Sequence, residues 1–310
     1  MEQNAKIYIA GHTGLIGSAM VRKLRSLGYS NIITKTHREM DLTQREKVKE
    51  FFEKQTPQYV FLAAAKVGGI FANSTYPAEF IYENLMIQTN VIDLSYRYGV
   101  KKLLFFASSC IYPKMCQQPM KGEYLMTGPL EPTNEPFGVA KLAGLKMCQA
   151  YNKQYGTNFI SVIPANVYGI NDHFNEDGHV LASLIRRFHE AKVEGKKDVT
   201  IWGTGRPRRE FFYVDDLAEA LIFLIDEYNE NEAINVGTGV DISIAELAGL
   251  IKETVGFEGN VNYDTTKPDG NPVRLLDIDR ITALGWKSKT QLKEGLRITY
   301  EWYERLVLNH

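Results

Sequence analysis

Ile7-Tyr8-Ile9-Ala10 runs directly into Gly11-His12-Thr13-Gly14-Leu15-Ile16-Gly17, and an amphipathic stretch follows over residues 15–27. The apolar run predicts a strand, and the spacing of the apolar residues after it predicts a helix. Taken alone, the three glycines could simply make a turn. Between a strand and a helix, they let backbone N–H groups at the helix N-terminus approach a pyrophosphate, so the stretch predicts a dinucleotide site.

The same alternation continues through the first half of the chain. Short apolar runs lie at residues 32–33, 59–64, 102–107 and 158–163, and amphipathic stretches lie at 46–54, 81–98 and 139–155. This rhythm predicts βαβ units and an α/β Rossmann fold with a doubly wound parallel sheet. In such a sheet the ligand crevice lies at the carboxyl ends of the strands.

The pattern loosens after Asn166 into loops rich in glycine, proline and aspartate. We expect a helix over residues 180–192 and two strands, at 211–214 and 233–236, that return to the same sheet. The sequence therefore predicts a Rossmann domain over residues 1–167 plus about 207–236. A smaller, discontinuous C-terminal substrate lobe is expected over about 168–206 and 237–310.

The composition is that of an ordinary globular protein, with 310 residues, 44% apolar and 24% charged. Lysine plus arginine (36) nearly balance aspartate plus glutamate (37), which argues against nucleic-acid or membrane-surface partners. Three cysteines without zinc spacing, Cys110, Cys116 and Cys148, predict neither a disulfide framework nor a metal site. With no signal peptide and no apolar run near 18 residues, we expect a cytoplasmic protein.

The residues after the second predicted strand indicate which dinucleotide binds. An NAD enzyme usually has an acidic residue there for the ribose 2′-hydroxyl, but this chain has Lys35-Thr36-His37-Arg38. Arg38 suits a 2′-phosphate and favours NADP(H), although the basic cluster could also be a solvated loop. The remaining cofactor contacts are expected from the glycine loop (Gly11, Thr13, Gly14, Leu15, Ile16, Gly17), beside the adenine (Asp41, Leu42), and along the backbone (Ala63, Ala64, Ala65).

Two short segments predict the reaction centre. Ser108-Ser109-Cys110 ends the strand expected at 102–107, and in extended chain the side chains of residues 108 and 110 point to the same side. Phe137 and Lys141 are four residues apart on a predicted helix and share one face.

A serine followed by a Tyr-x-x-x-Lys pair resembles the short-chain dehydrogenases/reductases, in which the lysine holds the nicotinamide ribose and lowers the tyrosine pKa. The closer resemblance is to the GDP-L-fucose synthases, and its motifs cover nearly the whole chain. They are Gly11-His12-x-Gly14-x-x-Gly17-Ser18-Ala19, Ser108-Ser109-Cys110-Ile111-Tyr112-Pro113-Lys114, Leu130-Glu131-Pro132-Thr133-Asn134-Glu135-Pro136, His179 with Arg186-Arg187-Phe188-His189-Glu190, Arg209-Glu210-Phe211, and Lys267-Pro268-Asp269-Gly270.

The resemblance implies a cytosolic homodimer that epimerises C3 and C5 of GDP-4-keto-6-deoxy-D-mannose and then reduces C4 with NADPH. It implies that Cys110 and His179 act as base and acid, beside Ser108, position 137 and Lys141. A thiolate and an imidazolium suit this task, because protons next to a ketone are acidic. It also places residues along the nicotinamide (Lys141, Pro164, Ala165, Asn166, Val167, His179) and along the GDP-sugar (Ser109, Cys110, Asn166, Arg187, Trp202, Arg209, Asp269).

Position 137 departs from the family pattern, because Phe137 stands where the family has its catalytic tyrosine. A phenyl ring has no proton to give to the alkoxide that forms at C4. The change is either a substitution made to trap a complex, which the loss of one oxygen favours, or a natural variant with another proton source. A second departure is Thr13, where some members have an arginine, so the preference for NADP depends more on Arg38.

Three other functions fit parts of the same pattern. A reductase for a GDP-4-keto-6-deoxy-heptose of a bacterial capsule pathway would need no epimerase activity. A nucleotide-sugar 4-epimerase would retain NAD, which the basic residues after the second strand oppose. Phe137 also allows a catalytically dead NADPH-binding module, although such a module has no need of Cys110, Lys141 and His179 together. For the homodimer, the helices at 81–98 and 139–155 could form a four-helix interface.

Overall fold

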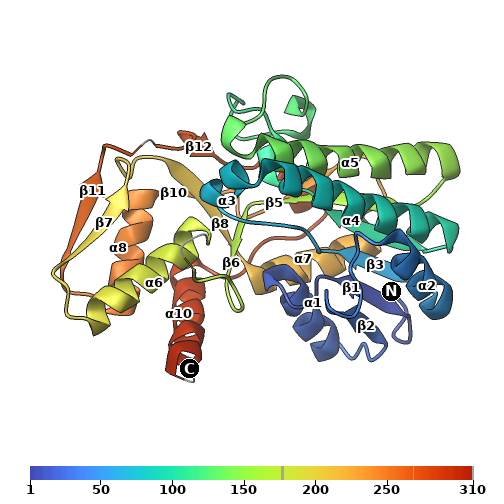
Figure 1. Ribbon diagram of the computed structural model, residues 1–310, viewed down its shortest axis with the longest axis horizontal. Coiled ribbons are helices and arrows are strands. Elements are labelled where there is room, and N and C mark those ends of the chain that lie inside the picture. Colours follow the sequence, from blue (N-terminus) through green and yellow to red (C-terminus); the bar gives the residue numbers. More distant parts are fainter. Residues whose placement is uncertain (176–177, 268, 309–310) are drawn as a thin grey trace.

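The computed structural model describes residues 1–175, 178–267 and 269–308. Figure 1 shows a larger part built around a parallel sheet, with the N-terminus, and a smaller lobe beside it that ends with the C-terminal helix. Pro268, which belongs to the motif at 267–270, lies outside the described residues.

The large sheet has six parallel strands in the order β2-β1-β3-β4-β5-β9. Their order reverses between β1 and β3, which is the position where doubly wound sheets bind ligands. Such strands are covered by helices on both faces and are therefore largely apolar, as in β4, whose five residues are all buried and of which only Lys102 is polar. The strands are β1 (Ile7–Ala10), β2 (Ile32–Lys35), β3 (Tyr59–Leu62), β4 (Lys102–Phe106), β5 (Phe159–Pro164) and β9 (Ile234–Val236).

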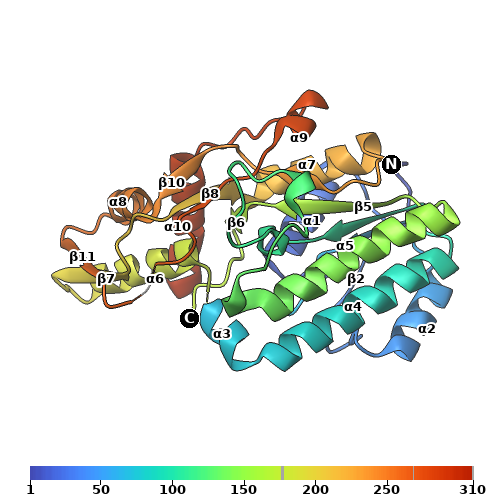
Figure 2. The ribbon, with the colours of Figure 1, turned by 90° about the horizontal axis from the view of Figure 1, so that it is seen from above.

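Helices cover both faces of this sheet. On one face, α2 (Arg45–Gln55), α4 (Pro77–Arg97) and α5 (Glu135–Tyr155) lie side by side (Figure 2). On the other face, α1 (Leu15–Ser26) packs against α7 (Val214–Glu227). The α/β Rossmann fold predicted from the sequence is confirmed.

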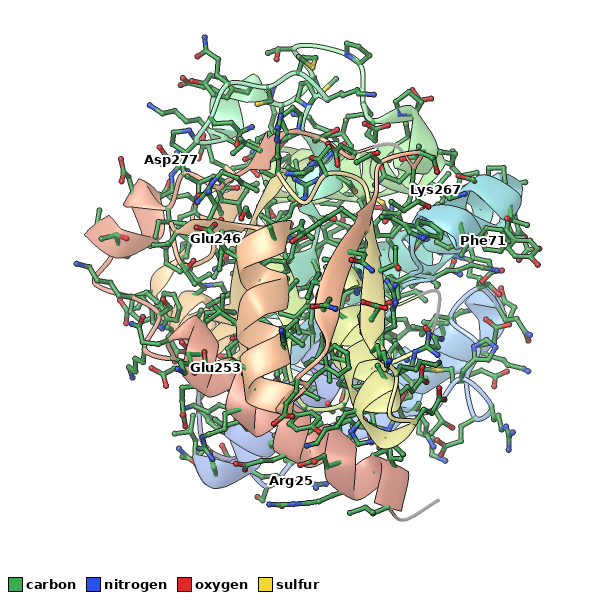
Figure 3. The ribbon with its side chains drawn as sticks, turned by 90° about the vertical axis from the view of Figure 1, so that its left-hand side faces the viewer. Arg25, Phe71, Glu246, Glu253, Lys267 and Asp277 are labelled. Carbon is green, nitrogen blue, oxygen red and sulfur yellow. The ribbon has the colours of Figure 1, made fainter. Side chains whose placement is uncertain are left out.

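The smaller lobe contains a second sheet, in which β10 (Asp241–Ser243), β8 (Arg208–Tyr213) and β12 (Val273–Arg274) are neighbours and β6 (Asn166–Tyr168) also pairs with β8. A separate parallel pair joins β7 (Asp198–Trp202) and β11 (Asn260–Asp264). The three longer helices of the lobe are α6 (Val180–Val193), α8 (Ile244–Val255) and α10 (Leu292–Leu308). Figure 3 looks onto this lobe, with α8 running from Glu246 to Glu253 in front.

The strand expected at 211–214 forms as β8, but its assignment to the large sheet was wrong. β8 pairs with β6, β10 and β12 in the smaller sheet. Its side chains alternate between two cores: Phe212 packs into the core of the large sheet, whereas Phe211 and Tyr213 pack into that of the smaller lobe. This alternation lets one strand join both parts of the molecule.

Two helices begin earlier than their apolar periodicity predicted. α4 starts at Pro77 and α5 at Glu135, and each has a proline in its first turn, where no backbone N–H is needed. Phe137 therefore lies in the first turn of α5. Short helical segments that the sequence did not predict include α3 (Ile70–Thr75), α9 (Asp279–Ala283) and the 3-10 turns η1 (Ser109–Ile111), η2 (Gly122–Tyr124) and η3 (Pro132–Asn134). In the part of the chain that the structure describes, no helix has the length and apolar character needed to cross a membrane.

Candidate active site

The glycine-rich loop packs against the end of β3 with no side chain between them. Gly11 has a φ of +85°, and a Cβ atom on it would lie 2.7 Å from the backbone N of Ala64. A Cβ on Gly17 would lie 2.1 Å from the carbonyl oxygen of Gly11. Gly14 is the N-cap of α1. Gly11, Gly14 and Gly17 thus leave three positions around the start of α1 without a side chain, which favours close approach by a pyrophosphate.

The residues expected around the adenosine lie beyond this loop. His37 and Arg38 are both exposed in the turn after β2, and no carboxylate of the described chain pairs with Arg38. Asp41 is fixed because its Oδ1 accepts hydrogen bonds from the Thr43 N–H at 2.9 Å and hydroxyl at 2.7 Å. His37, Asp41 and Thr43 line an open depression together with the first turns of α4. Arg38 is therefore available to an anion.

Lys141 is the buried cation of the site. Its side chain is 4% exposed, and its Nζ donates a hydrogen bond of 2.9 Å to the carbonyl oxygen of Phe106, the last residue of β4. The same atom lies 5.0 Å from the ring centre of Phe105 and 5.9 Å from that of Phe137. Desolvation lowers the pKa of Lys141 to about 8, although Cys110 opposes the shift. The shared helix face predicted for residues 137 and 141 is confirmed.

Cys110 does not lie in extended chain, and that expectation was wrong. Ser108 is extended, but η1 begins immediately after it, and the Ser108 Oγ accepts a hydrogen bond from the Cys110 N–H at 3.4 Å. This local cap turns the chain, so Cys110 is buried against α5, where a Cβ on Gly138 would lie 3.2 Å from the Cys110 carbonyl oxygen. Burial raises the pKa of the Cys110 thiol, and Ser108, Arg274 and Lys141 oppose that rise.

The ring of Phe137 packs against another aromatic ring and makes no hydrogen bond, since it has no polar atom. It meets Phe80 of α4 edge to face, with ring centres 6.3 Å apart, and it is half-buried. Such packing fixes the ring plane while the far edge of the ring carries no hydroxyl.

His179 is the N-cap of α6 and is solvent-exposed. Although part of the residue reaches solvent, surrounding protein atoms desolvate the imidazole and, together with the neighbouring His173, lower its pKa. The structure records no hydrogen bond between His179 and Cys110.

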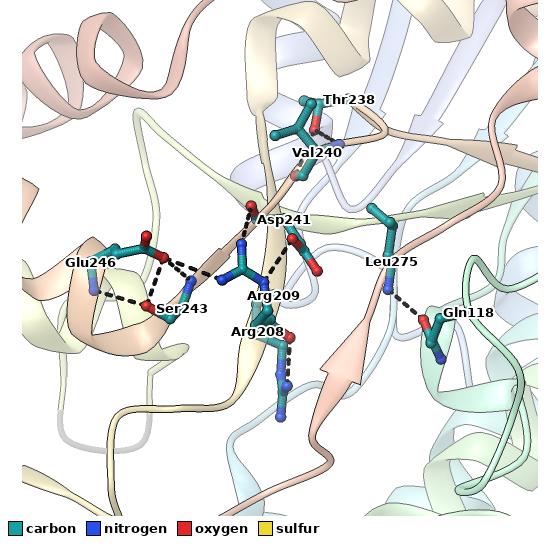
Figure 4. A network of polar contacts seen from close by, with 9 residues as sticks. All are labelled: Gln118, Arg208, Arg209, Thr238, Val240, Asp241, Ser243, Glu246 and Leu275. Carbon is teal, nitrogen blue, oxygen red and sulfur yellow. Dashed lines mark hydrogen bonds and ion pairs between the residues drawn. The ribbon is translucent and has the colours of Figure 1, made fainter.

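Arg209 and Arg208 are adjacent on β8 but have different surroundings. The Arg208 guanidinium pairs with Asp241 at 2.9 Å and with Glu246 at 3.4 Å (Figure 4). Arg209 donates only to backbone carbonyl oxygens, that of Arg208 at 2.8 Å and that of Asn271 at 2.6 Å. Within the described ranges no carboxylate pairs with Arg209. Desolvation, then the neighbouring Arg274, lowers the pKa of Arg209 to about 10. An unpaired, partly buried guanidinium is suited to an anionic ligand.

The other residues expected at the GDP-sugar lie on neighbouring elements of the smaller lobe. Arg187 on α6 donates a hydrogen bond to the carbonyl oxygen of Thr200. Trp202, at the end of β7, is 70% exposed, and Lys267 lies 5.5 Å above its ring. Asp269 accepts hydrogen bonds from the Thr204 N–H at 2.8 Å and hydroxyl at 2.7 Å. Asp269 thereby closes the loop next to Trp202.

The C-terminal end of β5 leads into the junction of the two lobes. Pro164 is the last residue of β5, and β6 begins at Asn166, whose side chain donates a hydrogen bond of 2.8 Å to the carbonyl oxygen of Glu210. Ala165 and Val167 complete this segment, and Ser109 lies in η1 beside Cys110.

Two residues of the site were missed from the sequence. Glu210 is 1% exposed, and its carboxylate accepts hydrogen bonds from the backbone N–H groups of Gly239 at 2.8 Å, Leu276 at 2.9 Å and Thr238. Arg274 lies opposite Arg209 in the ladder between β12 and β8. Glu210 lies in the motif Arg209-Glu210-Phe211, but nothing in that motif assigned it a role. Arg274 lies four residues after the motif at 267–270, and no pattern in the surrounding sequence indicates that it is near Arg209.

Comparisons with known proteins give a family match and several similar relatives. Residues 7–237 match the family described as "NAD dependent epimerase/dehydratase family". The chain is 55% identical to GDP-L-fucose synthase 1 of Arabidopsis thaliana, covering 99% of this chain and 96% of that protein. It is 47% identical to GDP-L-fucose synthase of Escherichia coli (strain K12), covering 96% of each.

Solved structures with the same fold include two enzymes from Campylobacter jejuni. A GDP-6-OMe-4-keto-L-xylo-heptose reductase superposes with a TM-score of 0.94 at 43% identity and covers 99% of both chains. A GDP-mannoheptose C4 reductase with NADP bound superposes with a TM-score of 0.90 at 45% identity, covering 98% of this chain and 99% of that one.

Proposed function

The chain belongs to the NAD dependent epimerase/dehydratase family and, within it, to the GDP-L-fucose synthases, and we propose that it epimerises and reduces a GDP-4-keto-6-deoxy-sugar. One observation carries the proposal: Cys110 and Lys141 meet at the end of β4, in the same molecule as an unpaired Arg209. A thiol base, a buried lysine and an anion-binding arginine are what this chemistry requires.

The residues present fit a bound dinucleotide, because Gly11 and Gly17, where a Cβ would clash with backbone atoms, let the loop fold tightly at the N-terminus of α1. Gly11, Gly14 and Gly17 would hold the pyrophosphate of NADPH, Arg38 its 2′-phosphate, and Lys141 its nicotinamide ribose. When bound, NADPH supplies the hydride for C4. The rest of the chemistry belongs to side chains of this chain.

For epimerisation, Cys110 acts as the base. Its thiolate takes the proton from the carbon next to the ketone, the electron pair of the broken C–H bond moves into the enolate, and the imidazolium of His179 returns a proton to the opposite face. Arg187, Arg209, Trp202 and Asp269 hold the GDP portion during both epimerisations, with Ser109 and Asn166 beside the sugar.

For reduction, an acid must protonate the alkoxide that forms at C4. Ser108 and Lys141 are in place, but Phe137 has no proton to donate. The loss of a positioned general acid costs about 10²–10⁴-fold in rate. The protein therefore binds its ligands and epimerises, but it reduces slowly.

Turnover with restored tyrosine tests this function. We expect Phe137→Tyr to oxidise NADPH in the presence of GDP-4-keto-6-deoxymannose at least ~10²-fold faster than the parent. Phe137→Leu is the matched control and should remain as slow as the parent. If the tyrosine variant gains no turnover on any GDP-4-keto sugar, the enzymatic function fails and a cofactor-binding module remains.

A second candidate is C4 reduction of a GDP-4-keto-6-deoxy-heptose without epimerisation. It is favoured by the close superposition on two GDP-heptose reductases over nearly the whole chain. Uptake of solvent deuterium at C3 and C5 distinguishes the two, because a reductase without epimerase activity leaves those protons in place.

We also propose that the chain forms a homodimer through α4 and α5. These helices lie side by side on one face, and they expose Tyr82, Tyr96, Val139 and Tyr155. Aromatic and apolar side chains on two adjacent helices suit a four-helix interface. A monomer in sedimentation at micromolar concentration would contradict this assembly.

A further inference from the structure

A side chain from a distant segment contacts the glycine-rich loop. Asn171 lies shortly after β6, and its side-chain amide donates hydrogen bonds to the carbonyl oxygen of Thr13 at 2.7 Å and to the Oγ of Ser18 at 3.3 Å. Thr13 belongs to the loop itself, and Ser18 lies in the first turn of α1. The segment that leads into the smaller lobe therefore touches the expected cofactor loop directly.

The amide of Asn171 can face Thr13 in only one orientation. A carbonyl oxygen only accepts hydrogen bonds, so the Nδ2 atom with its two N–H donors must point toward it. These two donors can serve Thr13 and Ser18 at once. The Ser18 hydroxyl in turn donates to the carbonyl oxygen of Leu15, the first residue of α1, at 3.1 Å. Asn171 thus braces both the loop and the start of the helix.

The peptide group between Thr13 and Gly14 is held at both of its polar atoms. Its carbonyl oxygen accepts from Asn171, and its N–H, which belongs to Gly14, donates to the carbonyl oxygen of Gly11 at 3.1 Å. Because a peptide group is planar, these two bonds fix its orientation. The N–H groups that follow, in the first turn of α1, have no partner within the helix and are the donors that a pyrophosphate needs.

The same contact also has an electrostatic effect. The oxygen of Thr13 carries a partial negative charge close to the place where a pyrophosphate is expected, and an Asn171 N–H offsets that charge. Asn171 therefore favours an anion at the loop through both the shape and the charge of the backbone.

The backbone around Asn171 is shaped by contacts within the protein. Asn171 has a φ of +72°, a left-handed conformation that asparagine tolerates better than most residues. The Asp172 N–H closes this turn on the carbonyl oxygen of Gly169 at 3.2 Å. Gly169 has a φ of +147°, and a Cβ on it would lie 2.6 Å from Cγ1 of Val214, the first residue of α7. The turn after β6 thus packs closely against α7.

We infer that Asn171 is a positioning residue for NADPH: it fixes the Thr13–Gly14 peptide, and with it the N–H groups at the start of α1 that bind the pyrophosphate. The inference rests on the proposed function, which places NADPH at this loop. β6 pairs with β8, the strand that carries Arg209. One continuous segment therefore joins the cofactor loop to the strand expected at the GDP-sugar.

Binding of two ligands, NADPH and adenosine 2′-phosphate, tests the inference. Adenosine 2′-phosphate carries the phosphate expected at Arg38 but has no pyrophosphate. Asn171→Gly keeps the left-handed backbone and removes both N–H donors. We expect this variant to bind NADPH roughly 3–10-fold more weakly in calorimetry, because it loses two hydrogen bonds beside the pyrophosphate. Its affinity for adenosine 2′-phosphate should equal that of the parent.

Two further variants complete the test. Asn31→Gly is the matched control: Asn31 also donates to a backbone carbonyl oxygen, that of Asn4 at 3.4 Å, but it precedes β2 at the opposite end of the large sheet. Its NADPH affinity should not change. Asn171→Asp keeps the shape of the side chain but a carboxylate cannot donate, so it should also bind NADPH more weakly. It provides the test if Asn171→Gly does not fold.

The possible results separate this inference from the proposed function. If either variant at Asn171 binds NADPH as tightly as the parent, the inference is wrong and the proposed function stands. Equal losses of both ligands in Asn171→Gly also overturn it, because they would show a general effect on the domain. A parent protein that binds no NADPH would contradict the proposed function and the inference with it.

Discussion

The Nζ atom of Lys141 lies 5.9 Å from the ring centre of Phe137, one turn earlier on α5, and donates a hydrogen bond to the carbonyl oxygen of Phe106. The lysine and the ring are thus held together at the end of β4. A hydroxyl on that ring would be near a cation whose pKa is already lowered to about 8. Under the proposed function, Phe137 leaves this site without the hydroxyl that would protonate the alkoxide at C4.

Burial of Lys141 predicts a specific dependence of stability on pH. Its pKa is about 8 in the folded protein against 10.5 normally, so the unfolded chain binds this proton more tightly. Below about pH 8 Lys141 is protonated in both states, and its burial lowers the free energy of unfolding by the full amount. This destabilisation disappears as pH rises toward 10.5, the pKa of lysine in the unfolded chain. Lys141→Met removes it. The free energy of unfolding of the variant relative to the parent should therefore fall by about 2 kcal/mol between about pH 7 and about pH 9.5.

Urea denaturation at the two pH values measures this difference. Comparison with the parent cancels the contributions of other groups, including Lys102, whose pKa burial also lowers to about 8. A difference that stays constant with pH would mean that Lys141 is not desolvated in the folded protein.

Burial of Asp172 predicts that the free energy of unfolding falls, rather than rises, as pH increases through the acid range. Desolvation raises its pKa from 3.8 to about 7, and one of its buried carboxyl oxygens has no hydrogen-bond partner among the residues that the structure describes. The folded protein therefore binds this proton more tightly, and its stability falls as pH rises from about 4 to about 7. Asp172→Asn keeps the shape of the neutral acid. We expect the variant to gain ~2 kcal/mol over the parent between about pH 5 and about pH 8 by denaturation. Equal slopes for both proteins would contradict the shift.

Arg209 is expected to bind the nucleotide, and its neighbour Arg208 provides a matched control. In the described part of the chain Arg209 has no carboxylate partner, whereas Arg208 pairs with Asp241 and Glu246. We expect Arg209→Gln to weaken GDP binding roughly 10–100-fold in calorimetry, because a hydrogen bond to a charged group contributes about 1.5–3 kcal/mol. Arg208→Gln should change the affinity by no more than about twofold, since exposed ion pairs contribute little. Equal losses in both variants would remove Arg209 from the site.

Alanine substitutions at Gly17 and Gly14 test the packing of the glycine-rich loop and its role in NADPH binding. A Cβ on Gly17 would lie 2.1 Å from a backbone oxygen, whereas at Gly14 the nearest atom is 3.6 Å away. Gly17→Ala must displace the loop, so we expect both a lower melting temperature and loss of NADPH fluorescence enhancement. Gly14→Ala should melt with the parent. Unchanged NADPH affinity in Gly17→Ala would show that the loop does not hold the cofactor.

Local patterns predicted the parts of the site that depend on neighbours in sequence. The four-residue spacing of Phe137 and Lys141 placed them on one helix face, and the strand before Gly11 placed the loop at a helix N-terminus. The turn at Cys110 was missed because it depends on a weak cap by the Ser108 side chain.

Contacts between distant segments could not be predicted in the same way. β8 was placed in the wrong sheet because its alternating aromatic residues serve two cores, and periodicity does not tell which core each one enters. Arg274 reaches the site through a parallel pairing with β8, 65 positions earlier at Arg209, and no local spacing indicates it. Family resemblance, rather than pattern, identified His179.

Deuterium exchange shows whether the protein epimerises its substrate separately from whether it reduces it. The parent and Phe137→Tyr are each incubated with GDP-4-keto-6-deoxymannose and NADPH in deuterated water, and the label at C3 and C5 is followed together with NADPH. We expect deuterium to enter both positions with both proteins, while only the tyrosine variant consumes NADPH rapidly. NADPH consumption by the tyrosine variant without deuterium at C3 or C5 would contradict this expectation and would establish a reductase without epimerase activity.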